Sequence, residues 1–211
     1  MPRMSREVTE QHRRQVVENT SRLIREKGPE RVTVPEAMAS AGLSHGGFYR
    51  HFASKDDLLA QALTAAFTER RTAMDQIAEE STAPDAPPAH DAFLAVYLSE
   101  LHRDHPADGC PAAAVAADAA RAEPGSPLRT SFTAGVRDLA EGLHRLNGSS
   151  GRDADAGDRP LAELALLVGA VLLARASDDA SLSRDILDEA RGLLRDRTAQ
   201  EPALPEEPFA G

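Results

Sequence analysis

The sequence predicts an all-α protein. Apolar residues recur at the three- and four-residue spacing of a helix face in several successive segments. Clusters of glycine and proline, which end helices, separate these segments. No stretch of the sequence alternates apolar and polar residues as a half-buried strand does, and no internal repeat is present. We therefore expect a three-helix N-terminal unit followed by a larger helical body.

The N-terminal unit begins with a helix expected over Arg6–Lys27, which the following Gly-Pro pair ends. Thr33 is suited to cap a second helix, and Glu36 completes a capping box. Gly42 then provides the left-handed residue at its end. Ser44 is suited to cap the third helix. Two short helices joined by a glycine turn are typical of a helix-turn-helix, whose second helix enters the major groove of DNA.

A fourth helix is expected from about Lys55 to Glu80, capped by Ser54. It follows without a linker and would tie the helix-turn-helix rigidly to the body. Further helices are expected over about 91–105, 111–122, 128–146, 160–175 and 182–197. The glycine- and aspartate-rich segment 147–159 is expected to be mobile.

This organisation divides the chain into a DNA-binding domain at 1–54, a helical regulatory and dimerisation domain at 55–198, and a disordered tail at 199–211.

Charge is distributed unevenly along the chain. The net charge is −10, which by itself argues against a nucleic-acid partner. However, residues 1–55 hold ten Lys or Arg and six Asp or Glu, a net charge of +4, whereas the remainder holds 14 and 28, a net charge of −14. A basic end on an acidic body is expected when one small module meets phosphate. Chance clustering of arginines on a solvated helix is the alternative.

The composition also bears on the cellular compartment. A single cysteine among 211 residues excludes an intramolecular disulfide and favours a reducing cytoplasm. No apolar run reaches the roughly 18 residues of a membrane span. The N-terminus lacks the apolar core of a signal peptide. We expect a cytoplasmic protein without a membrane partner.

Four segments together resemble the DNA-binding domain of the TetR family of transcriptional repressors. They are Thr33-Val-Pro-Glu-Ala-Met38, Ala41-Gly-Leu-Ser44, Gly47-Phe-Tyr-Arg-His-Phe52 and Ser54-Lys-Asp-Asp-Leu58. The resemblance covers residues 14 to 60. The chain departs from the family pattern at Pro29, where an aromatic residue is usual, at Pro35 within the second helix, and at His45, where lysine is common.

The resemblance implies which residues contact DNA. His45 and Gly47 lie near the start of the recognition helix, where they would approach base edges. Tyr49 and His51 match family positions that contact phosphate, although packing against the first helix is the alternative for both. The full set of expected DNA-binding residues is Thr33, Ser44, His45, Gly46, Gly47, Tyr49, Arg50, His51 and Lys55. Phe48 and Phe52 are expected in the core.

The helix expected over 160–175 has almost no polar face, so it must be buried on all sides. Together with the last helix it resembles the family's dimerisation surface, in which two helices from each chain form a four-helix bundle. The expected interface residues are Leu164, Leu167, Val168, Val171, Leu172, Ile186, Ala190 and Leu193. A purely intramolecular core is the alternative. A two-fold homodimer implies a palindromic double-stranded DNA operator.

Members of the family bind a small-molecule inducer in a cavity between the middle helices. The residues of this chain that match such a cavity are Phe67, Met74, Phe93, Tyr97, Cys110, Ala114 and Phe132. The same residues would equally suit an ordinary core.

Cys110 precedes Pro111, which suits a first helical position, so the thiol is expected at a helix N-cap. A helix N-terminus stabilises a thiolate. The segment Asp108-Gly-Cys-Pro-Ala-Ala-Ala114 resembles one in TetR-family branches that include sensors of electrophiles. Against a sensor stand the nearby Asp108 and the lack of an adjacent lysine, and a small packing residue is the alternative. His102, His105 and Cys110 match no standard zinc spacing, so no metal or cofactor is expected.

Three functions follow from these observations. The first is a ligand-responsive transcriptional repressor that binds its operator as a homodimer and is released by a small molecule in the C-terminal domain. The second is an electrophile- or redox-responsive repressor that senses through Cys110. The third is a constitutive DNA-binding protein without a ligand. An enzyme is not expected, because no nucleophile–base pair, phosphate loop or metal set is present in the sequence.

Overall fold

The computed structural model describes residues 6–148 and 159–199. Every regular element in these two ranges is helical, which confirms the predicted all-α fold. The expected mobile segment and disordered tail fall almost entirely outside the described residues. Nowhere in these ranges is a helix long and apolar enough to span a membrane.

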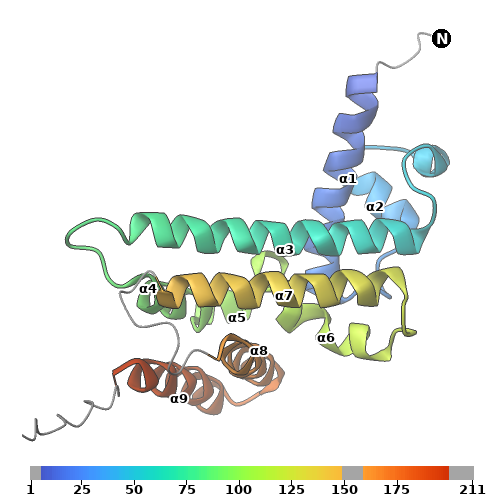
Figure 1. Cartoon of the computed structure of the whole chain (residues 1–211). Helices are drawn as coiled ribbons and strands as arrows, with labels where there is room; N and C mark the ends of the chain where they lie inside the picture. The colour runs from blue at the N-terminus through green and yellow to red at the C-terminus, as the bar shows by residue number, and fades with distance from the viewer. Residues whose placement is uncertain (1–5, 149–158, 200–211) are drawn as a thin grey trace, which may run out of the picture.

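The N-terminal unit consists of α1 (Arg6–Lys27), α2 (Val34–Ser40) and the 3₁₀ helix η1 (His45–Arg50). Figure 1 shows α1 crossing α3 at one end of the molecule, with α2 and η1 beside it. The observed bounds of α1 are the predicted ones. The third element is a short 3₁₀ helix, a tighter form that seldom exceeds a few residues.

The caps of this unit were predicted with one error. The Thr33 hydroxyl accepts a hydrogen bond from the Glu36 backbone N–H at 3.4 Å, and Gly42 has a φ of +68°, as expected for a left-handed helix end. The predicted cap at Ser44 is wrong, because its side chain makes no capping hydrogen bond. Its carbonyl instead accepts from the Gly47 N–H at 3.1 Å, which begins the tighter helix.

Two long helices form the centre of the body. α3 (Lys55–Glu80) and α7 (Pro127–Gly148) run side by side in the same direction (Figure 1). Gly135 and Gly142 allow this close approach. A Cβ added at Gly135 would lie 2.1 Å from the Phe67 ring, and one at Gly142 would lie 2.7 Å from the Met74 side chain. The Phe67 ring and the Met74 thioether of α3 therefore occupy the space that side chains at Gly135 and Gly142 of α7 would need.

The remaining elements surround this pair. They are α4 (Ala89–Tyr97), α5 (Glu100–Asp104), η2 (Pro106–Asp108), α6 (Pro111–Arg121), α8 (Pro160–Ala176) and α9 (Ala180–Ala199). The single helix predicted over 91–105 is broken in two. Leu98 leaves the helical conformation, and the Ser99 hydroxyl caps α5 by accepting from the His102 N–H at 3.1 Å.

A buried polar pair joins α4 to α8. The His90 Nε2 atom lies 2.7 Å from the Glu163 carboxylate, and both side chains are almost fully buried. Asn147, near the end of α7, donates a further hydrogen bond to Glu163 at 3.3 Å. An arrangement that separated these side chains would leave buried polar groups without hydrogen-bond partners, which is costly. The pair therefore favours the observed meeting of α4, α7 and α8 at these ends.

Arginines of α1 and α3 hold the turn between η2 and α6. Arg25, only 3% exposed, donates to the Gly109 carbonyl at 3.1 Å. Arg70 donates to the Asp108 carbonyl at 2.9 Å, and Arg22 forms a two-armed ion pair with the Asp108 carboxylate. Because α1 belongs to the N-terminal unit, these bonds tie that unit to the body at a second place besides α3.

His102 is a structural residue of the same region. Its Nδ1 donates to the Tyr97 carbonyl at 2.6 Å, and its Nε2 accepts from the Cys110 N–H at 2.8 Å. Burial lowers the pKa of His102 to about 4. Neutral imidazole with a proton on Nδ1 is the form that makes both bonds.

The pKa of His102 predicts a loss of stability in mild acid. Below pH 6.5 the unfolded chain gains a proton at His102 that the folded chain does not gain until about pH 4. The free energy of unfolding should therefore fall by about 3 kcal/mol across this window through His102 alone. Urea denaturation at a series of pH values measures this loss. His102→Gln should flatten the profile, while the exposed His105→Gln should retain it. Parallel profiles for wild type and His102→Gln would contradict the prediction.

Candidate DNA-binding surface

The residues predicted to contact DNA lie together at the end of the molecule formed by α2, η1 and the start of α3 (Figure 1). Their side chains reach solvent to different extents. Thr33, Ser44, His45, Gly46, Tyr49 and Arg50 are exposed, whereas Gly47, His51 and Lys55 are half-buried. The nine residues thus lie on three neighbouring elements, and six of the nine are exposed.

Two aromatic residues anchor η1 from beneath. Phe48 and Phe52 are buried, with their ring centroids 5.5 Å apart, as predicted for core residues. Tyr49 stacks edge-on against Phe48 at 5.2 Å but is 81% exposed. This exposure contradicts the alternative that Tyr49 packs against α1, and it leaves the phenol free to meet a phosphate.

The two glycines of η1 are not demanded by internal packing. A Cβ at Gly46 would have no neighbour within 4 Å, and one at Gly47 would make an ordinary 3.7 Å contact with Met38. Neither glycine has a positive φ. Neither packing nor backbone conformation therefore requires glycine at these two positions, and the predicted reason for them remains close approach to base edges beside His45.

His51 carries a buried ring nitrogen. Its Nδ1 has no hydrogen-bond partner within the described part of the chain. Burial lowers the pKa of His51, and the nearby His12, Arg50 and Arg13 lower it further. The imidazole is therefore mainly neutral at neutral pH.

Lys55 lies in the first turn of α3, where the helix dipole also favours an anion. Its ammonium group donates to the Glu30 carbonyl at 3.3 Å. The Ser54 hydroxyl caps the helix by accepting from the Asp57 N–H at 3.0 Å, as predicted. This cap fixes the start of α3 and therefore the position of Lys55 next to η1.

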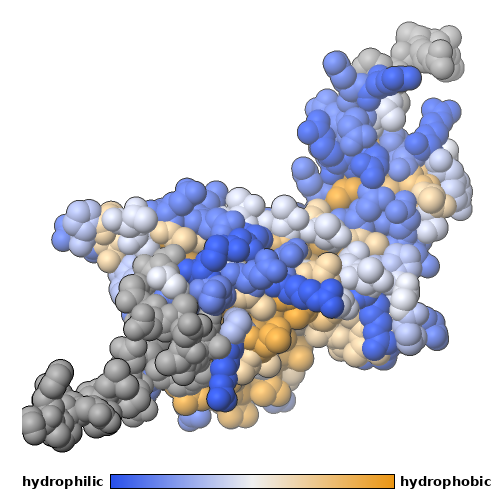
Figure 2. Space-filling model, viewed as in Figure 1, coloured by the Kyte–Doolittle hydropathy of each residue, from blue (hydrophilic) through white to orange (hydrophobic). Residues whose placement is uncertain are grey.

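The residues expected in a dimer interface divide into two groups. Leu164, Leu167, Val171 and Ala190 are buried within the single chain, so they support the α8–α9 face from beneath. Val168 and Ile186 are half-buried, and Leu172 and Leu193 are exposed. Three further leucines of α8 and α9 are exposed, namely Leu161, Leu173 and Leu182. Figure 2 shows hydrophobic residues gathered over α8, while the part around α1 is largely hydrophilic.

The seven residues expected around a ligand cavity form part of the core. Phe67 packs edge-on against Phe132 at 5.9 Å between α3 and α7, and Phe93 lies 5.3 Å from Tyr97 in α4. Met74 and Cys110 are buried, and Ala114 is half-buried. A large hollow of the structure lies elsewhere, between α1 and α3, and none of these seven residues lines it.

Cys110 sits at the N-cap of α6, as predicted, and is completely buried. Burial and the neighbouring Cys110 raise the pKa of Tyr97 well above its ordinary value. A thiol without solvent access matches the packing interpretation. Both ring nitrogens of His102 are engaged in hydrogen bonds, so His102 has no free atom for a metal. Within the described ranges, no cluster of three His, Cys, Asp or Glu residues is arranged to hold one.

The contacts that link the N-terminal unit to the body are not among the predictions made from the sequence. Arg22 and Arg25 are among the basic residues that give residues 1–55 their net positive charge. Their partners, Asp108 and Gly109, are 86 and 84 residues away. One feature of the sequence could have indicated that Arg25 is buried. Its spacing along α1 places it on the same helix face as the buried Ser21 and Ile24.

Residues 16–62 match the family model described as bacterial regulatory proteins, tetR family. A search of curated proteins finds no match. The solved structures similar to this chain include a TetR-family transcriptional regulator from Cytophaga hutchinsonii, with 16% identity and a TM-score of 0.70 over 95% of this chain and 100% of that one. E. coli NemR in its reduced form shows 19% identity and a TM-score of 0.68 over 88% and 96%.

A TetR-family transcriptional regulator from Streptomyces coelicolor shows 22% identity and a TM-score of 0.65 over 93% of this chain and 98% of that one. At these identities the similarity establishes a common fold over nearly the whole chain.

Proposed function

The chain belongs, through its N-terminal domain, to the tetR family of bacterial regulatory proteins, and from that premise we propose a specific mode of action. Residues 1–54 bind a palindromic double-stranded operator, and residues 55–198 form a homodimer and bind a small-molecule inducer. Operator binding represses transcription, and the inducer releases the protein from DNA. The protein acts in the cytoplasm and is not an enzyme.

The observation that carries this proposal is the exposed surface around η1. Tyr49 is held out into solvent by the buried Phe48, and two glycines without a packing role lie next to His45. Phosphate contacts fix the register of such a motif, and contacts to base edges give sequence specificity. In this arrangement Tyr49, His51 and Lys55 position the element, while His45 and the adjacent backbone read the bases.

The exposed leucines of α8 and α9 support the dimer. Leu161, Leu172 and Leu173 on α8 lie beside Leu182 and Leu193 on α9 without cover from the described part of the chain. Gly169 has nothing within 4 Å of an added Cβ, so a partner helix can approach there. An apolar face of this kind favours association with a second copy. Two-fold symmetry then presents two η1 elements to one operator.

Release by an inducer follows from a population shift. A ligand that binds more tightly to a conformation with the wrong spacing of the two η1 elements lowers the fraction of operator-competent dimer. The continuous helix α3 begins next to η1 and extends through the body, so a displacement in the body reaches the DNA-binding surface directly.

The proposal is tested by selecting operator DNA from a random pool with the full-length chain and measuring affinity by fluorescence anisotropy. The selected sequence should be palindromic. An unrelated sequence bound with equal affinity would contradict a specific repressor. Release is tested by adding candidate small molecules to the preformed complex, and a compound that binds the protein should lower operator affinity.

Lys55→Gln should reduce the salt dependence of operator binding. Each phosphate contact contributes about 0.9 to the slope of log affinity against log salt, so loss of one contact per protomer lowers it by about 1.8 for the dimer. Affinity should fall for all DNA sequences alike, because a phosphate contact carries no sequence information. Arg137→Gln, an exposed change on α7, provides the matched control and should keep the wild-type slope. An unchanged slope for Lys55→Gln would remove Lys55 from the interface.

A further inference from the structure

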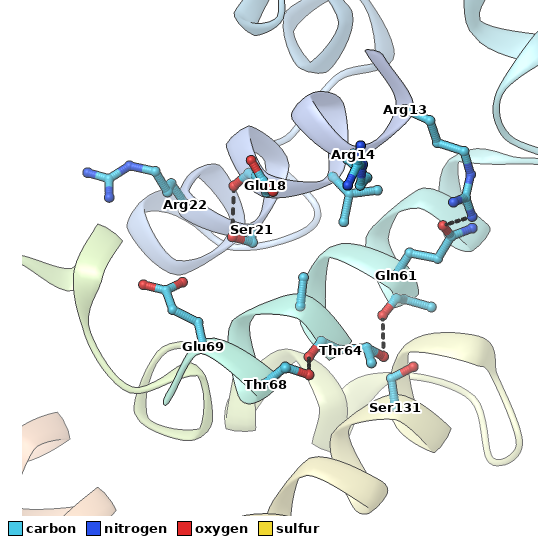
Figure 3. Close-up of a pocket in the computed structure, with 13 residues that line it drawn as sticks. Arg13, Arg14, Glu18, Ser21, Arg22, Gln61, Thr64, Thr68, Glu69 and Ser131 are labelled. Carbon is cyan, nitrogen blue, oxygen red and sulfur yellow. Dashed lines mark hydrogen bonds between the residues drawn. The ribbon is translucent and has the colours of Figure 1, made fainter. Parts of the chain in front are cut away.

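A hollow of about 740 Å³ lies between α1, α3 and the start of α7. Figure 3 shows side chains of α1 facing those of α3 across it, with Ser131 of α7 at its edge. Small-molecule sites in proteins occupy roughly 300–1,000 Å³. The α1–α3 groove is therefore large enough for a compact organic ligand.

The wall that α3 contributes is made of small side chains. Ala60 and Ala65 lie next to Thr64 and Thr68. Both threonine hydroxyls donate to carbonyls of their own helix, at 3.0 Å each, so their polar atoms are already satisfied. Val17 of α1 faces this wall. The groove thus offers an apolar lining to the body of a ligand.

The charged lining residues differ in how they are engaged. Arg13 is held by Glu10 and Gln61, and Arg22 by Asp108. The carboxylate of Glu69 is neutralised by the buried Arg25 at 2.7 Å. Arg14 forms no ion pair or side-chain hydrogen bond with any described residue. Its guanidinium group is therefore available to a ligand in the groove.

The lining holds three arginines and two glutamates, and one glutamate, Glu69, is already paired with Arg25 from outside the groove. Glu18 is the remaining carboxylate without an ion pair among the described residues. Arg14 and Glu18 are therefore the two unpaired charges of the described lining, and the formal charge of the whole lining is 3 − 2 = +1. A guanidinium group binds a carboxylate through two parallel hydrogen bonds.

We propose that the α1–α3 groove binds a small organic anion with an apolar body, whose carboxylate pairs with Arg14 and whose chain lies against Val17 and the small residues of α3. This site is separate from the core positions between the middle helices. Because α1 and α3 also frame the DNA-binding surface, an occupant lies where the two parts of the chain join.

Isothermal titration of the full-length chain with sodium octanoate tests the site. Octyltrimethylammonium, which has a chain of the same length and the opposite charge, is titrated in parallel. Octanoate should bind at one site per chain, and octyltrimethylammonium should bind at least tenfold more weakly. Equal affinities, or tighter binding of the cation through Glu18, would overturn the proposal. The titration contains no DNA, so it tests the groove separately from operator binding.

Four variants locate the binding. Arg14→Gln should weaken octanoate binding at least tenfold, and Thr64→Phe should abolish it by filling the groove. Their matched controls, Arg137→Gln and Thr133→Phe, should bind as the wild type does. Thr133 suits this purpose because it is exposed and donates to its own helix at 2.9 Å, as Thr64 does.

The melting temperature of Thr64→Phe shows whether this variant folds. If it does not fold, octanoate binding by Arg14→Gln alone tests the site. Equal octanoate binding by all four variants would place the anion elsewhere, for example on the apolar face of α8 and α9, and would overturn the proposal.

Discussion

Gly135→Val should destabilise the protein by about 3 kcal/mol, among the largest effects of any single change in the body. The position faces Phe67 across the α3–α7 interface, where an added Cβ would lie 2.1 Å from the ring. Cβ atoms do not approach other non-bonded heavy atoms this closely in folded proteins. In the variant, α7 must therefore shift away from α3, or the Phe67 ring must adopt another rotamer. Urea denaturation at a fixed protein concentration measures the loss of unfolding free energy.

A control variant and a compensating one sharpen this test. Gly192→Ala replaces a glycine of α9 whose added Cβ has no neighbour within 4 Å, so it should leave stability unchanged or raise it by up to about 1 kcal/mol. Combining Gly135→Val with Phe67→Leu should recover part of the loss, because the smaller side chain vacates the space of the ring. A loss below about 1 kcal/mol for Gly135→Val alone would show that the helices are not so closely packed.

Leu193→Glu should separate the proposed dimer and lower operator affinity by about 100-fold or more. Leu193 is 54% exposed in the single chain, so a glutamate there leaves each chain folded. Its charge would, however, be buried without a partner in the interface between two copies. A monomer contacts one half-site and loses the effective concentration that links the two contacts of the dimer. Analytical ultracentrifugation and fluorescence anisotropy measure the two effects.

Two controls separate association from other causes. Leu193→Met keeps an apolar side chain of similar volume and should preserve both the dimer and operator binding. Thr133→Glu adds the same negative charge on the exposed side of α7 and should also behave as the wild type. If Leu193→Glu sediments as a dimer with full operator affinity, the α8–α9 face is not the dimer interface.

Local signals in the sequence predict most of the helix boundaries. The bounds of α1 and α3 follow from the caps and breakers that flank them, and these signals act within a few residues. The break between α4 and α5 was missed because the apolar spacing of Phe93, Tyr97 and Leu101 continues across it. Only the capping bond at Ser99 reveals that the backbone leaves the helix.

Contacts between distant segments were not predictable in the same way. The pair His90–Glu163 joins residues 73 apart, and no local pattern marks either member as a partner of the other. The same limit applies to the expected ligand cavity. Its expected lining includes Phe67 and Met74, and no local pattern in the sequence shows that Gly135 and Gly142 of α7 pack directly against these two side chains. The distance between two packed helices depends on the side chains of both facing surfaces. These surfaces lie far apart in the sequence, so no local pattern predicts the distance.

The helix-turn-helix itself was the most predictable part of the candidate site, because the motif is short and its geometry is set by nearby caps. The burial of Phe48 and Phe52, which the sequence predicts, anchors η1 on the N-terminal unit. The 3₁₀ geometry of η1 was not predicted, because one turn of either helix type has the same cap and the same apolar positions.

The turn between η2 and α6 has a consequence for how the molecule unfolds. Arg25 is buried in α1 yet satisfies the Gly109 carbonyl of that turn, and Arg22 holds Asp108 beside it. Opening either part exposes polar groups that the other part had satisfied, so we expect the two parts to unfold in one cooperative transition. We therefore expect a single unfolding transition for the residues on either side of the proposed domain boundary at residue 54.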